Sequence, residues 1–87
     1  MKVYHDERCE RFYVTLPEGE AELVYGEFGE GILDLQHTEV PPSARGDGVA
    51  DALVRAALAF AREGGYRVVA TCPYVQRWLK THPEERP

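Results

Sequence analysis

Side chains that commonly act in proton and group transfer lie in two short segments, HTEV at 37–40 and TCPYV at 71–75. His37 and Glu39 alternate, so on a strand they would share one face, where either could remove a proton from an attacking group. Cys72 could supply a thiolate nucleophile, and it could equally be a small buried apolar side chain. Tyr74, in the second segment, could pack on a sheet. His37, Glu39 and Cys72 are the candidate catalytic residues that these segments offer by themselves.

A glycine-rich bend, RGDGVA at 45–50, is the second candidate site. The start of a helix presents unpaired backbone N–H groups and a partial positive charge, and glycines let a ligand approach the backbone closely. Together with Arg45, such a bend can bind a phosphate group. It matches neither a Walker sequence nor GxGxxG. The alternative is a helix start whose glycines only make the turn, with Asp47 matching the helix dipole.

Hydrophobic periodicity predicts the elements that must position these residues. Alternation of apolar and polar residues predicts three antiparallel strands in a meander, at 11–16, 20–28 and 32–40, and residues 2–5 could form a short first strand before them. Apolar residues then recur every three or four positions, which predicts an amphipathic helix from Gly48 to Glu63 that stops at Gly64 and Gly65. The apolar, β-branched run YRVVAT at 66–71 predicts an inner strand, parallel to an earlier one because a helix crosses over before it.

Pro73 opens a short last helix, and the polar tail THPEERP is expected to be frayed. The order β-β-β-β-α-β-α indicates an α+β fold with a mostly antiparallel sheet of about five strands, a central β-α-β unit and a short C-terminal helix. No repeat or linker divides the chain, so we expect a single domain over residues 1–87.

Composition excludes several classes of function. The net charge of −5 argues against general nucleic-acid binding, which needs a basic face. No apolar run is long enough to span a membrane, and the N-terminal segment is too charged for a signal peptide, so a cytoplasmic protein is expected. Cys9 and Cys72 share no motif and are expected to be free thiols. No Cys/His cluster has zinc spacing, so no metal site is predicted.

The glycine bend and its flanks resemble a known family. The GNAT superfamily of N-acetyltransferases carries Gln/Arg-x-x-Gly-x-Gly/Ala between a strand and a helix, and Arg45, Gly48 and Ala50 occupy these positions. Three flanking segments complete the likeness to a subfamily of very short GNAT-like, acyl-CoA-binding proteins: HTEVPP at 37–42, CPYV at 72–75 and HPE at 82–84. The resemblance covers roughly residues 2–85.

The resemblance implies acetyl-CoA as the ligand. Its pyrophosphate would lie on the backbone of residues 45–50, which adds Gly46, Asp47 and Val49 to the cofactor-binding set. Its pantetheine arm would lie between the strand ends at Val40 and Cys72, with the Val40 amide polarising the thioester carbonyl. The thiol of Cys72 could accept the acetyl group. Tyr74 lies near where the superfamily often keeps a tyrosine that reprotonates the leaving thiolate.

This sequence departs from full-length members of the superfamily in one respect. They carry one or two helices between their first two strands, which help to form the acceptor pocket, and here only a short link is available. Two hypotheses share the ligand: an acetyltransferase acting on an unidentified amine, such as a macromolecule or second subunit that completes the acceptor wall, and a non-catalytic acyl-CoA-binding sensor. A third is a β-sheet module whose glycines only make a turn.

Overall fold

The computed structural model describes residues 1–86 and contains five strands and two α-helices in the predicted order. The strands are β1 (Tyr4–Asp6), β2 (Arg11–Leu16), β3 (Gly19–Phe28), β4 (Ile32–Glu39) and β5 (Arg67–Ala70). The helices are α1 (Val49–Gly64) and α2 (Pro73–Thr81), with short 3₁₀ turns η1 (Pro42–Ala44) and η2 (Pro83–Glu85). The sheet order is β1-β2-β3-β4-β5, antiparallel except for the parallel β4–β5 pair, which confirms the predicted α+β fold.

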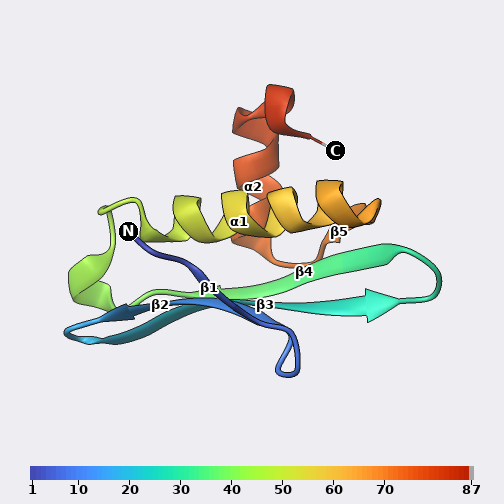
Figure 1. Cartoon of the computed structure of the whole chain (residues 1–87). Helices are drawn as coiled ribbons and strands as arrows, with labels where there is room; N and C mark the ends of the chain where they lie inside the picture. The colour runs from blue at the N-terminus through green and yellow to red at the C-terminus, as the bar shows by residue number, and fades with distance from the viewer. Residues whose placement is uncertain (87) are drawn as a thin grey trace.

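The core lies between the sheet and α1, which runs along one face of it (Figure 1). In β2 and β3 the alternate residues Phe12, Val14, Ala21, Leu23 and Tyr25 are buried, and most of the apolar stripe of α1 is buried against them, with Leu16, Ala56 and Phe60 partly buried. The largest buried aliphatic side chains of the core are Leu23, Leu33, Leu35, Leu53 and Leu58. Figure 1 shows α2 standing up from the same side of the sheet, and in residues 1–86 no helix covers the opposite face.

Glycines set both ends of α1. Gly48, at its N-cap, has φ of 82°, and Gly65, at its C-cap, has φ of 72°. Both values lie in the left-handed region that favours glycine, and the Gly65 amide closes the last turn on Ala61 and Arg62. The predicted glycine stop is therefore confirmed, with the helix shifted by one residue from the predicted bounds.

A β-bulge in β4 decides which of its residues face the core. Tyr25 of β3 pairs with Leu35, whereas the neighbouring Val24 pairs with His37, so Gln36 is the extra residue. Before the bulge the odd-numbered residues Leu33 and Leu35 are buried. After it the inward parity passes to Thr38, and His37 becomes exposed.

Two predictions about the second half of the chain were wrong. The segment at 66–71 forms not an inner strand but the edge strand β5, which pairs with β4 alone and leaves Val69 44% exposed. Its apolar composition reflects packing of Val68 and Ala70 on the core. The tail is not frayed over 82–86, where it forms η2; Pro87 lies outside the described residues.

Within residues 1–86, no helix is both long and apolar enough to cross a membrane. The same residues contain no group of three or more His, Cys, Asp or Glu side chains that could hold a metal ion. Cys9 is an exposed free thiol and Cys72 a buried one.

Candidate functional site

The site begins where β4 and β5 separate. Their parallel pairing ends at Leu35 and Ala70. The Leu35 carbonyl then accepts two amides, from Thr71 at 3.1 Å and from Cys72 at 3.0 Å. Beyond this point β4 continues to Glu39, whereas the segment after β5 turns away into α2. The two elements diverge, so within residues 1–86 the backbone of β4 after the bulge has no strand neighbour on the β5 side.

A pocket of about 760 Å³ opens between the end of β4, the start of α1 and α2. Most of the residues predicted for the site line it: His37, Glu39, Val40, Arg45, Gly46, Gly48, Val49, Ala50 and Tyr74. Two predicted residues, Asp47 and Cys72, do not. The sequence analysis missed four lining residues, which are Thr38, Ala44, Asp51 and Arg77. Arg77 could have been found, because it lies one helical turn after Tyr74 and so on the same face of α2.

The loop that enters α1 commits only some of its backbone amides. The amide of Arg45 donates to the carbonyl of Pro42, and that of Asp47 to the carbonyl of Ala44, both at 3.3 Å. The first helical hydrogen bond runs from Ala52 to Gly48 at 3.0 Å. The N–H groups of residues 49–51, the first-turn amides, therefore have no partner within the helix and are available to a ligand. The backbone amides of Arg45 and Asp47, which were predicted to bind the ligand, already donate to carbonyls of the loop.

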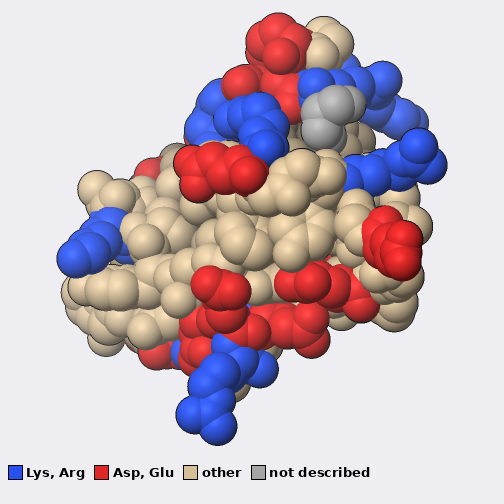
Figure 2. Space-filling view, turned by 45° about the vertical axis from the view of Figure 1, so that its right-hand side comes forward, with Lys and Arg blue, Asp and Glu red and all other residues tan. Residues whose placement is uncertain are grey.

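Two arginines flank the first-turn amides. Arg45 lies on the entry loop, where its Nε donates to the carbonyl of Val40 at 3.3 Å, and Arg77 lies on α2. Both side chains line the pocket, and within residues 1–86 neither forms an ion pair, unlike Arg11 and Arg55. On the face shown in Figure 2, basic and acidic side chains are mixed in the upper part of the molecule, and acidic ones form a band lower down. The charges of Arg45 and Arg77 make the pocket suited to an anion.

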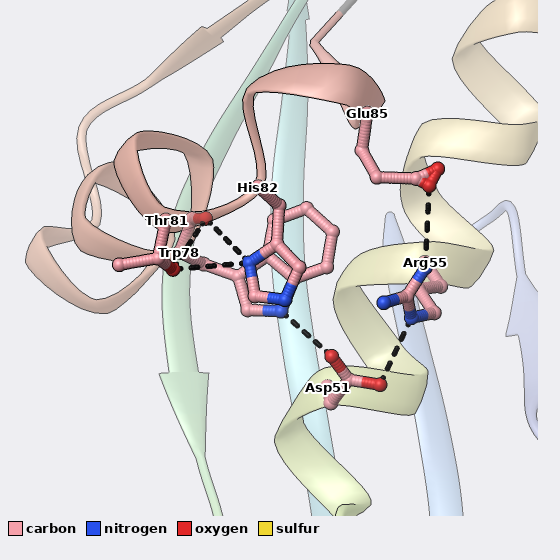
Figure 3. A network of polar contacts seen from close by, with 6 residues as sticks. All are labelled: Asp51, Arg55, Trp78, Thr81, His82 and Glu85. Atoms are coloured by element: carbon pink, nitrogen blue, oxygen red, sulfur yellow. Dashed lines mark hydrogen bonds and ion pairs between the residues drawn. The ribbon is translucent and has the colours of Figure 1, made fainter.

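Asp51 is an acidic residue that lines the pocket, and its charge is compensated within the protein. Its carboxylate accepts Nε1–H of Trp78 at 2.8 Å and Nε–H of Arg55 at 3.0 Å (Figure 3). Burial alone would raise the pKa of Asp51, but these two hydrogen bonds and the charge of Arg55 outweigh it and hold the pKa below its usual value. Asp51 is therefore ionised at neutral pH without presenting a free carboxylate to the pocket.

Cys72 lies behind the pocket wall. Its side chain is 4% exposed, and its Sγ lies 3.5 Å from Oγ1 of Thr38, which does line the pocket. The bulge in β4 creates this arrangement, because it turns Thr38 toward the core side. The thiol is therefore one side chain away from the pocket.

His37, Glu39 and Tyr74 line the same pocket. The bulge makes the two β4 side chains exposed, and they share a face as predicted. Tyr74 begins α2 and is partly buried. Burial, assisted by the nearby negative charge of Asp51, raises the pKa of the Tyr74 hydroxyl, so it is a proton donor and not a base at neutral pH.

Comparisons with known proteins agree with this geometry. A sequence model of the family described as GCN5-related N-acetyl-transferase matches residues 11–86. Protein NATD1 of Bos taurus is 44% identical over 85 residues, which make up 95% of this chain and 75% of the bovine protein. Protein NATD1 of Homo sapiens is 42% identical, with the same 95% and 75% coverage.

Among solved structures, the NMR solution structure of a GCN5-like protein from Staphylococcus aureus has a TM-score of 0.72, covering 97% of this chain and 82% of that one. At 22% identity, this likeness shows a shared fold. The family model matches most of the chain, and the NATD1 proteins are similar to it in sequence, so the likeness is one of sequence as well as of fold. The chain belongs to the GCN5-related N-acetyltransferase family.

Proposed function

We propose that the pocket binds acetyl-CoA and that the protein transfers the acetyl group to an amine. This proposal names a ligand and a reaction for the general N-acetyltransferase-like role of the family. One observation carries this proposal. The first-turn amides at 49–51 and the side chains of Arg45 and Arg77 line the same pocket as a candidate base, His37 or Glu39, and a candidate acid, Tyr74. Such a lining fits a ligand that carries both a phosphate group, at what we call the phosphate end, and a reactive group.

The residues at the phosphate end match the chemistry of a pyrophosphate. Backbone N–H groups at a helix start bind oxyanions without needing a lysine, and the helix dipole favours negative charge there. Gly48 leaves space in front of them, because nothing lies within 4 Å of the position of a Cβ on this residue. Arg45 and Arg77 would add charge-assisted hydrogen bonds from opposite sides.

The other candidate residues match acyl transfer to an amine. Acetyl-CoA would supply a thioester, whose carbonyl carbon an amine can attack. His37 or Glu39 would take the proton from the amine, and both side chains are exposed toward the face from which an acceptor can approach. The Val40 amide would stabilise the carbonyl oxygen as negative charge develops on it. Tyr74 would protonate the sulfur that leaves.

Direct transfer is favoured over a relay through Cys72, because the thiol lies behind Thr38 instead of lining the pocket. A second candidate function, a non-catalytic acyl-CoA sensor, is favoured by the absence of an acceptor wall. Within residues 1–86 β1 and β2 are joined by a link of only four residues, and no helix covers the outer face of the sheet. The two functions share the ligand and differ in turnover.

Calorimetric titration with acetyl-CoA, compared with S-acetylpantetheine, tests the binding half of the proposal. Because the smaller thioester lacks the pyrophosphate, we expect it to bind at least tenfold more weakly. Equal affinities, or no binding of acetyl-CoA, would overturn the assignment of the phosphate end. A time course of free CoA release with a panel of amines then separates transferase from sensor, since a sensor gives no release above the buffer rate.

A further inference from the structure

One wall of the pocket depends on the position of a short helix. Tyr74 and Arg77, which we call the α2 wall, project from a helix of nine residues whose N-cap, Cys72, makes no side-chain capping hydrogen bond. Only two side chains of this helix are fully buried, Val75 and Trp78. A helix this short is not stable by itself, so its contacts with the rest of the protein decide where the wall stands.

A polar network joins α2 to the first turn of α1 (Figure 3). Trp78 donates its indole N–H to Oδ1 of Asp51 at 2.8 Å, and Arg55 donates to Oδ2 of the same carboxylate at 3.0 Å. Arg55 also reaches Oε2 of Glu85 at 3.2 Å, and its guanidinium lies 5.2 Å from the centre of the Trp78 ring. Asp51 thus links α1 with the C-terminal segment through both of its oxygens, directly through Trp78 and indirectly through Arg55, which contacts Glu85.

His82 also holds the indole ring of Trp78 in place. The imidazole of His82 stacks on it with ring centres 3.9 Å apart and planes inclined by 9°. Nδ1–H of His82 donates to the Trp78 carbonyl at 2.8 Å, since a carbonyl can only accept. The indole N–H is therefore directed at Asp51 by a fixed ring. The hydrogen bond that it makes reports the position of α2 relative to α1.

The location of Asp51 gives this link a consequence for the site. Asp51 lies three residues after Gly48, lines the pocket, and contributes one of the first-turn amides through its own backbone. The same residue thus places an amide at the phosphate end and anchors the helix that carries Tyr74 and Arg77. An acidic side chain beside an anion site would otherwise oppose binding, and its two protein partners remove that penalty.

We propose that Asp51 is a positioning residue, which fixes the α2 wall against the first turn of α1 and so sets the spacing between the two sides of the pocket. The role rests on the proposed function in one respect only, that acetyl-CoA is the ligand whose affinity reports the spacing. Asp51 contacts the ligand through its amide alone and acts on Tyr74 and Arg77 through Trp78.

Four variants test this role. Asp51→Ala removes the acceptor, and Trp78→Phe removes the donor but keeps a smaller aromatic ring at this position. The double variant removes both the donor and the acceptor of this hydrogen bond. Asp51→Asn is the conservative variant, because its amide oxygen can still accept from Trp78. Glu85→Gln is the matched control: it removes the outer ion pair of Arg55 and leaves the Asp51–Trp78 bond in place.

Calorimetry with acetyl-CoA should show about tenfold weaker binding, or about 1.4 kcal/mol, for Asp51→Ala and for Trp78→Phe. The double variant should be no weaker than either single variant, because both break the same bond. Asp51→Asn should stay within about threefold of wild type, and Glu85→Gln should bind as wild type does. A purely structural role would instead predict that affinity follows global stability, which denaturation of the same variants measures.

A second readout needs no ligand. Trp78 is the single tryptophan of the chain, so its indole ¹H–¹⁵N resonance is resolved and reports the bond to Asp51 directly. In Asp51→Ala this resonance should shift, and hydrogen exchange of the amides at 74–79 should become faster while the core amides of β3 keep their rates. If wild type binds and Asp51→Ala binds equally well with unchanged exchange, the positioning role is wrong. If wild type itself fails to bind acetyl-CoA, the proposed function fails, and the resonance and exchange data alone decide whether Asp51 holds the α2 wall.

Discussion

Replacement of Gly48 by alanine separates ligand binding from stability at the phosphate end of the pocket. A Cβ on this residue meets nothing within 4 Å in the ligand-free protein, so the methyl group causes no clash. It does place a side chain on the lining of the pocket, at the N-cap of α1. A phosphate oxygen must come to about 2.9 Å from an amide nitrogen to form a hydrogen bond, and a methyl group in front of the first-turn amides prevents that approach.

The expected losses follow from the two effects. The backbone at Gly48 has φ of 82°, where a residue with a Cβ is strained by about 1–2 kcal/mol. Alanine also lowers the conformational entropy of the unfolded chain, which offsets about 0.4–1 kcal/mol of this strain. The net loss of unfolding free energy is therefore about 1 kcal/mol. Loss of one or two charge-assisted hydrogen bonds, at about 1.5 kcal/mol or more each, should weaken acetyl-CoA binding by about ten- to a hundredfold.

Gly65 provides a matched control. It caps the opposite end of α1 with φ of 72°, and a Cβ there also meets nothing within 4 Å. Gly65→Ala should therefore lose a similar unfolding free energy, measured by urea denaturation, and keep the wild-type affinity, measured by calorimetry. Wild-type affinity in Gly48→Ala would refute the phosphate site. An equal loss of affinity in Gly65→Ala would show that binding merely follows helix stability.

Three further outcomes are expected. Cys72→Ala should bind acetyl-CoA as wild type does. Intact-mass analysis after incubation should show whether any acetylation of wild type is lost in this variant, with Cys9→Ala as the control. Acetylation that survives in Cys72→Ala would exclude this thiol as an acceptor. Tyr74→Phe should leave acetyl-CoA affinity within about threefold and lower the rate of CoA release about a hundredfold, because it removes the proton donor but little contact area; an unchanged rate would exclude Tyr74 as the acid. Burial, together with nearby glutamates, raises the pKa of Tyr25 to about 12 from its usual 10, so its contribution to stability is complete below pH 10 and is lost as the pH rises toward 12. Urea denaturation at pH 9 and pH 11 should show this decrease in wild type and a smaller one in Tyr25→Phe, whereas equal decreases would assign the pH dependence to other groups.

Local patterns were sufficient for most of the fold. The alternation in RFYVTL and the three- and four-residue spacing of α1 each match one geometric period, and burial follows that period in the structure. The glycines at both ends of α1 were also readable, because a left-handed backbone favours glycine wherever it occurs. Periodicity did not determine the position of β5 in the sheet, because its apolar run was also consistent with a buried inner strand. Whether a strand lies inside a sheet or at its edge depends on neighbours that its own residues do not specify.

The candidate site divides in the same way. Residue types and spacing alone pointed to the glycine bend and to His37 and Glu39, because their chemistry is carried by a few neighbouring residues, whereas the role of Tyr74 came from the family resemblance. The bulge at Gln36 was not visible, yet it is what makes Thr38 cover Cys72 and leaves His37 exposed. The bond between Asp51 and Trp78 was equally hidden, since the two residues are 27 positions apart in the sequence. Sequence thus determined the chemical groups and the elements that carry them, whereas the distances between those groups were decided by packing, which depends on residues from every element at once.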